Sequence, residues 1–124
     1  MPFTVATANK VLNKLLRNQD FQHPSQIYVS LHTGDPGENG ANEVTGGGYK
    51  RQLVTFSTPS NKQTSNPSNI EFGNMPACTI THMGLWDAET GGNFWWGGQL
   101  VISKQIDVGD SVRFKAGDLD VILE

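Results

Sequence analysis

The chain has 124 residues, of which 36% are hydrophobic, 17% charged and 14 are glycine, so its length suits one domain with one core. A hydrophobic share below the ~45–50% typical of globular chains disfavours a helical bundle and favours a domain of short strands and many turns. The net charge of −3 argues against a protein that binds DNA or RNA through phosphates, and no apolar run reaches the ~18 residues of a membrane span.

The first predicted element is a helix over residues 6–17. Thr4 or Thr7 can cap its start, and Asn18 can end it, because asparagine tolerates the left-handed conformation that closes helices. Its apolar side chains recur at helical spacing: Val5, Ala8, Leu12, Leu15 and Leu16. Two interpretations remain open: the helix covers an open end of a sheet, or it docks on a neighbouring subunit.

We therefore treat residues 1–26 as an N-terminal helical arm, with Leu12 and Leu16 as candidate interface residues. Residues 1–5 contain no basic stretch followed by an apolar one, so no secretory signal is expected. With Cys78 as the one cysteine, no internal disulfide can form. This cysteine content fits assembly in a reducing cytoplasm.

From residue 27 onward the hydrophobic pattern changes to the period of two that is typical of strands. Strands are predicted over residues 27–32, 49–56, 70–72, 78–86, 94–105, 112–114 and 119–123. Polar loops are expected at 33–48, which holds six glycines in sixteen residues, and at 57–68. The pattern predicts a mainly β fold, an antiparallel β-sandwich or jelly-roll of seven to eight short strands, in a single domain over residues 27–124.

The sequence offers no specific catalytic constellation. His82 could be combined with Asp35 or Asp87 and a serine, but most chains offer such a set, and no G-x-S-x-G motif is present. A histidine hydrogen-bonded beside a sheet is the simpler interpretation of His82. We predict no enzymatic activity, no catalytic residue and no cofactor.

Oxygen-bearing side chains gather in the 33–48 loop: Asp35, Glu38, Asn39, Asn42 and Glu43. Their spacing does not fit the calcium-binding helix-loop pattern, and one cysteine with three scattered histidines gives no zinc spacing. Residues 46–48 are all glycine, but a strand-like sequence follows them rather than the helix N-terminus that a phosphate cradle uses. Solvated turns are therefore predicted here, and no metal site.

An aromatic cluster closes one predicted strand at Trp86 and opens the next at Phe94, Trp95 and Trp96. Because side chains alternate along a strand, Phe94 and Trp96 are expected on one face and Trp95 on the other. Only one face of a sandwich sheet meets the core, so Trp95 should lie on the outer face. Either a loop of the same chain covers it or another copy does; aromatic anchors are enriched in interfaces, which makes Trp95 the third candidate interface residue.

Three blocks of sequence, in order and spacing, resemble a family of small bacteriophage virion structural proteins. The blocks are 30–38 (SLHTGDPGE) with 47–52 (GGYKRQ), 81–88 (THMGLWDA) with 91–93 (GGN), and 109–114 (GDSVRF) with 116–119 (AGDL). Members are labelled tail-fibre-like, and similar small β proteins serve as capsid cement or decoration proteins. The resemblance implies a non-enzymatic virion component that assembles as a homotrimer.

The main prediction is a homotrimeric capsid cement protein that ties neighbouring major capsid subunits and stabilises the head. It would lie on the capsid exterior of the virion after assembly in the host cytoplasm. Its expected partners are copies of itself and the major capsid protein, with no nucleic acid and no membrane. The absence of long shaft repeats and of a separate receptor-binding tip favours this role. The alternative is a tail-fibre or baseplate component that contacts the host surface, with the 33–48 and 57–69 loops binding sugars.

Overall fold

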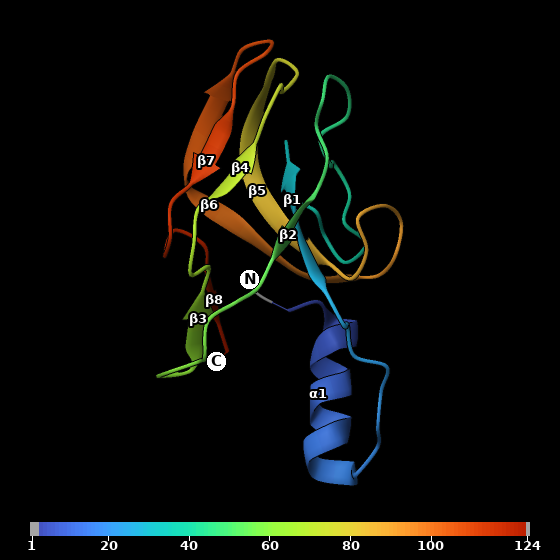
Figure 1. The fold of residues 1–124 in the computed structure, drawn as a ribbon. Coiled ribbons are helices and arrows are strands. Elements are labelled where there is room, and N and C mark those ends of the chain that lie inside the picture. The colour runs from blue at the N-terminus through green and yellow to red at the C-terminus, as the bar shows by residue number, and fades with distance from the viewer. Residues whose placement is uncertain (1–2, 124) are drawn as a thin grey trace.

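The computed structural model describes residues 3–123 and shows one helix and eight strands within them (Figure 1). The helix α1 spans Val5–Arg17; the strands are β1 Ile27–His32, β2 Gln52–Val54, β3 Gln63–Ser65, β4 Ile70–Phe72, β5 Cys78–Trp86, β6 Phe94–Ile106, β7 Val112–Phe114 and β8 Asp120–Ile122. Residues 1, 2 and 124, the ends of the predicted arm and β domain, lie outside the described residues. All strand pairs are antiparallel, which confirms the mainly β prediction of a small sandwich with one helix.

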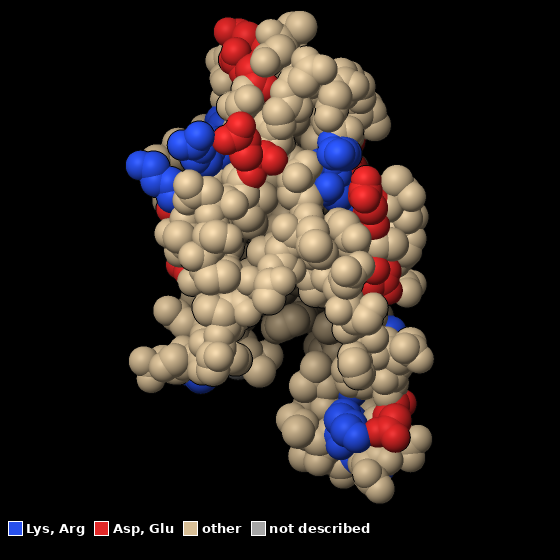
Figure 2. Space-filling model, in the orientation of Figure 1, with Lys and Arg blue, Asp and Glu red and all other residues tan. Residues whose placement is uncertain are grey.

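Helix α1 begins and ends where the capping residues predict. The Thr4 hydroxyl accepts a hydrogen bond from the Thr7 backbone N–H at 3.1 Å, which satisfies an amide that the helix start leaves free. Asn18 closes the helix in the left-handed conformation with φ 53°. In Figures 1 and 2, α1 projects from the β body, and a hollow separates it from the β3–β8 pair. No helix of the described chain is long and apolar enough to cross a membrane.

The main sheet has the strand order β2-β1-β5-β6, and β4-β7 and β3-β8 form two further two-stranded sheets. On β1, Val29 pairs with Leu85 and Leu31 pairs with Met83, so these side chains share one face. They join one apolar core with residues of β4 and β7, where Phe72 and Phe114 meet edge to face at 6.2 Å. The β body is thus a sandwich whose core lies on one face of the main sheet.

Two predicted boundaries are wrong. Strand β3 lies inside the predicted 57–68 loop, because its three polar residues show no alternation and its partner, β8, is distant in sequence. The strand predicted over 49–56 is reduced to β2, because Leu31, the next residue of β1 whose backbone groups face this edge, already accepts from the Val44 N–H and donates its own N–H to the Tyr49 hydroxyl.

The predicted face assignment of the aromatic cluster is also wrong, because β6 contains a bulge at Trp95. Trp96 pairs with Leu85 whereas Phe94 pairs with Trp86, so two steps along β6 match one step along β5. Adjacent residues of β5 point to opposite faces, and so do their partners. Trp96 therefore lies in the core, while the Phe94 ring lies on the opposite face, 5.1 Å from the Trp86 ring.

Candidate functional site

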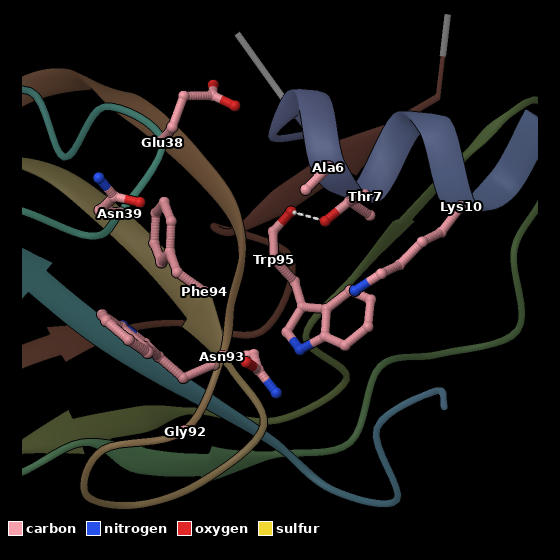
Figure 3. A pocket seen from close by; sticks show the side chains of 10 residues that line it. Ala6, Thr7, Lys10, Glu38, Asn39, Gly92, Asn93, Phe94 and Trp95 are labelled. Carbon is pink, nitrogen blue, oxygen red and sulfur yellow. Dashed lines mark hydrogen bonds between the residues drawn. The ribbon is translucent and has the colours of Figure 1, made fainter. Parts of the chain in front are cut away.

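The first turn of α1 holds the helix to the β body. The Trp95 carbonyl oxygen accepts hydrogen bonds from the Thr4 backbone N–H at 3.3 Å and from the Thr7 hydroxyl at 2.9 Å; the second is drawn in Figure 3. Phe3 extends this contact by pairing with Trp96, and the Val5 N–H donates to the Glu38 carboxylate at 2.7 Å. The Trp95 carbonyl, at the bulge, thus binds the start of α1 instead of a neighbouring strand.

Trp95 lies beneath the helix and is only 7% exposed. The Lys10 ammonium sits 4.6 Å from the centre of its ring, and the Phe21 ring approaches it at 6.1 Å. Its own chain therefore covers Trp95, and the side chain offers little surface to a second copy in this conformation. Lys10 and Phe21 were not singled out by sequence reasoning, since neither belongs to the apolar pattern that predicts the helix or the strands.

The apolar side of α1 remains open. Val5 is 63% exposed, Leu12 54%, Leu15 74% and Leu16 77%. Together with the exposed Ala8 they form the surface that we call the apolar stripe of α1. The structure thus separates the three predicted interface residues: Leu12 and Leu16 lie side by side on this stripe, and Trp95 lies under the opposite flank of the helix. Their role in an interface stays a prediction.

A hollow of about 280 Å³ lies where α1 meets β6, and Figure 3 shows the side chains around it. Its walls include charged and amide groups of three segments, contributed by Lys10, Glu38, Asn39 and Asn93. Glu38 is already engaged by the helix start, and the Trp95 ring is covered. The half-buried Phe94 ring also lines the hollow and packs against the Trp86 ring at 5.1 Å.

The face of the main sheet opposite the core carries a buried polar chain. The Trp86 indole N–H donates to the Ser30 hydroxyl at 2.8 Å, and that hydroxyl lies 2.6 Å from Nε2 of His32. Nδ1 of His32 lies 2.7 Å from the Ala41 carbonyl oxygen, which can only accept, so Nδ1 carries the proton. Burial, the largest cause, lowers the pKa of His32 and keeps the ring neutral. The 33–48 loop thereby covers this face.

A second polar network fixes the same loop. Arg51, 8% exposed, donates to both carboxylate oxygens of Glu43 at 2.9 Å and to the carbonyls of Ala88 and Gly91. The Tyr49 hydroxyl donates to Glu43 at 2.7 Å. Burial alone would raise the pKa of Glu43, but the hydrogen bonds from Arg51 and Tyr49 outweigh it and hold this pKa below its usual value. Burial and the Glu43 carboxylate raise the pKa of Tyr49, which stays protonated.

The residues considered for catalysis make hydrogen bonds to groups that are close to them in the sequence. Asp35 accepts the Gly37 N–H at 2.9 Å, Asp87 accepts from Asn93, and Nδ1 of His82 lies 2.8 Å from the Thr81 hydroxyl. They do not come together as a triad. Within residues 3–123 no cluster of three or more His, Cys, Asp or Glu side chains has the geometry to hold a metal ion.

Comparison with known proteins gives one finding that covers nearly the whole chain. A search of the curated proteins finds no match. A family model described as podophage GP4 fiber I protein gp80 matches residues 2–122. This match confirms the resemblance to small phage virion structural proteins, and its name fits the tail-fibre alternative at least as well as the cement prediction. The chain belongs to the family of podophage GP4 fiber I protein gp80, a family of phage fibre structural proteins.

Proposed function

We propose that this chain is a structural subunit of a phage tail fibre and assembles as a homotrimer without enzymatic activity. The observation that carries the proposal is the family match over residues 2–122. The organisation of the chain supports it: a small β body is braced on both faces of its main sheet, and a short helix projects from it with an uncovered apolar side. These features suit a module whose task is to join other subunits.

The cement role predicted from the sequence depended on the absence of shaft repeats and of a receptor-binding tip. Neither feature argues against a fibre built from several different chains. The family description favours the fibre role, which the sequence left as the alternative. We therefore place the subunit in the fibre and take copies of itself, not the major capsid protein, as its first partners.

Direct recognition of host sugars by the 33–48 loop has less support. Three polar side chains of this loop are engaged within the chain: Asp35 with Gly37, Asn42 with the Asp35 carbonyl, and Glu43 with Arg51. A side chain that already holds its own loop is a poor donor or acceptor for a ligand. This arrangement supports a scaffolding role within the fibre.

Gold-labelled antibody against the chain, bound to intact virions and viewed by electron microscopy, tests the location. Label along the tail fibres is expected, and label over the capsid shell would overturn the fibre assignment in favour of the cement role. Light scattering on the purified chain tests the assembly state. A mass of three chains is expected, and a monomer across the micromolar range would contradict the homotrimer.

A further inference from the structure

We propose that the apolar stripe of α1 is the surface through which copies of this chain associate, with the α1 helices of three copies packed side by side. The inference deepens the proposed fibre homotrimer and rests on it, because it names the surface that would join the subunits. It starts from an unusual feature of α1: the helix contacts its own β body through its polar flank.

Two residues show that α1 contacts the β body through its polar flank. Thr7 is the buried residue of α1, and Lys10, on the same side, covers the Trp95 ring. Helices of globular domains normally turn their apolar side to the core and their polar side to water. In α1 this relation is reversed, and Leu15 and Leu16 are 74% and 77% exposed. A surface patch of this kind marks a contact with another molecule.

The spacing of the stripe fits a helical partner. Val5, Ala8, Leu12 and Leu15 follow one another at intervals of three, four and three residues, the repeat that brings apolar side chains to the seam of a coiled coil. Because α1 of another copy carries the same repeat, the helix is complementary to itself.

The width of the stripe favours more than two helices. Val11 and Leu16 flank the seam on its two sides, and at 3.6 residues per turn the apolar sector from one to the other spans about 140°. A two-helix seam uses a narrower sector, formed by the two heptad positions alone. In a bundle of three, each helix turns such a broad sector toward two neighbours at once.

The area of the stripe sets the expected strength of the association. The exposed stripe offers apolar surface on the order of 400 Å², comparable with the largest patch on a typical monomer. A stable interface takes about 800 Å² from each partner, so contacts through α1 alone should associate weakly, in the micromolar range that the test below covers. Three helices bury the full breadth of the stripe, whereas two would leave its margins in water.

The charges of α1 do not oppose this packing. The helix carries Lys10, Lys14 and Arg17 and no acidic residue, yet none of these three lies on the stripe. Lys10 lies over Trp95, Lys14 forms an ion pair with Asp20, and Arg17 donates to Asn13 at 3.1 Å. Like charges are therefore kept away from the seam when helices associate.

The test uses the full chain and a matched pair of leucines. Leu12 is 54% exposed on the stripe, and Leu53 is 53% exposed on β2 of the β body. Sedimentation velocity from about 1 to 200 µM compares the wild-type chain, the double variant Leu12→Gln with Leu15→Gln, and the control Leu53→Gln. We expect the double variant to associate at least tenfold more weakly and the control to stay within twofold of wild type. Circular dichroism confirms that each variant is folded.

A cross-linking experiment reports the contact directly. In a Cys78→Ser background, Leu12→Cys should form a disulfide between chains under mild oxidation, because this position would face its copy across the seam. The control Arg17→Cys, on the far side of the helix, should remain a monomer on a non-reducing gel. The reverse pattern, or no difference, would overturn the proposed packing.

The remaining outcomes separate this inference from the function on which it rests. An oligomer that persists in the double variant overturns the stripe as the interface but leaves the fibre homotrimer standing. A wild-type chain that is monomeric at 200 µM overturns both the stripe and the homotrimer, while antibody labelling of virions still decides the location. Binding of the monomer to vesicles of three parts phosphatidylcholine and one part phosphatidylserine, lost in 0.5 M salt, would assign the stripe to a lipid surface instead.

Discussion

Arg51 lies inside the strand predicted over residues 49–56, and in the folded chain it is 8% exposed and central to a polar network. Its guanidinium joins Glu43 to two carbonyls of the 87–93 turn and lies 3.7 Å from the centre of the Trp86 ring. The planar group satisfies all these partners at once, which a lysine could not do. One side chain therefore holds two loops against the sheet.

Removing this cation should cost far more than removing an exposed one. Arg51→Met leaves the Glu43 carboxylate without its cation and two carbonyls without their donor, and breaking a buried pair of this kind costs about 3–5 kcal/mol. The matched control is Arg113→Met, which breaks the exposed pair with Glu71 and should cost less than about 1 kcal/mol. Urea unfolding followed by tryptophan fluorescence measures both. Equal losses of unfolding free energy in the two variants would contradict this account.

His32 makes the stability of the chain depend on pH. Its ring accepts at Nε2 from Ser30 and donates at Nδ1 to Ala41, so a second proton at Nε2 would make the Ser30 hydroxyl turn its own proton away and give up this hydrogen bond. Burial lowers its pKa below the usual 6.5. The groups that also act on this ring are Glu43, which favours the charged form, and Arg51 and His82, which oppose it.

Because the folded-state pKa is lower than the unfolded one, the unfolded chain binds more protons once the pH falls below about 6.5. The free energy of unfolding should therefore decline between pH 7 and pH 5, by at most about 1.4 kcal/mol per pH unit. The depressed pKa of Glu43 acts in the same direction only at more acidic pH, below its usual 4.5. Urea titrations at pH 7, 6 and 5 measure the slope. His32→Gln should flatten it, and an unchanged slope in that variant would rule out His32 as its source.

At the scale of elements, the bulge at Trp95 places two adjacent tryptophans in different environments. Trp96 packs in the core of the sandwich, whereas Trp95 lies between β6 and the helix α1. Both are 7% exposed, so exposure alone does not distinguish them. Their surroundings do, because one is enclosed by the β body and the other by the arm.

Alanine substitutions should reveal this difference. Trp96→Ala opens a cavity in the core and should lower the free energy of unfolding by about 3–5 kcal/mol. Trp95→Ala removes the surface on which Lys10 and Phe21 lie, so α1 should lose protection while the β body keeps most of its own. Hydrogen exchange resolved by peptide, over residues 3–26 and over β1 and β5, measures both effects. Equal loss of protection in the two regions of the Trp95 variant would contradict the assignment.

The sequence predicts those elements whose signals are local. The bounds of α1 follow from Thr4 and Asn18, and β5 is predicted at its observed bounds from its alternation and the turn after it. The bulge at Trp95 is not predictable in this way, since one extra residue reverses the faces without changing the pattern of side chains. The packing of the 33–48 loop on the outer face of the main sheet is not predictable either, because no periodic sequence pattern accompanies it. It depends on the Ala41 carbonyl and on Gly40, where a Cβ would lie 2.2 Å from the Trp86 ring.

The candidate surface is predictable only in part, for a related reason. Leu12 and Leu16 stand out in the sequence because they belong to a helical repeat, and the structure leaves both exposed. Which flank of α1 faces the body depends on two hydrogen bonds to one carbonyl of a bulged strand. No pattern in the helix itself encodes that choice. The sequence thus indicates an amphipathic arm but not the side that is left free.

At the scale of the whole molecule, the low hydrophobic content and the exposed apolar stripe of α1 both point to a chain that buries part of its apolar surface by association. A chain with 36% hydrophobic residues leaves several large ones in water, and four of them lie on α1. All twelve acidic residues of the sequence lie outside this helix, so the arm is basic and the remainder of the chain is acidic. Helices gathered at a common axis would place the acidic bodies around it, where their mutual repulsion keeps them apart.

If association covers the stripe, the thermal stability of the chain must depend on its concentration, since a partner that binds only the folded state adds to the free energy of unfolding. Raising the ratio of concentration to dissociation constant to about 100 adds about 2.7 kcal/mol. In a chain of this size, about 1 kcal/mol moves the Tm by roughly 3–5 °C. Differential scanning fluorimetry at 2 and 200 µM should therefore show a Tm that rises by several degrees in the wild-type chain. The Leu12→Gln, Leu15→Gln variant should show the same Tm at both concentrations and match the wild-type chain when dilute, because neither leucine contributes to the core. A wild-type Tm independent of concentration would mean that the stripe stays in water, and the exposed leucines of α1 would then need a partner other than a second copy of the chain.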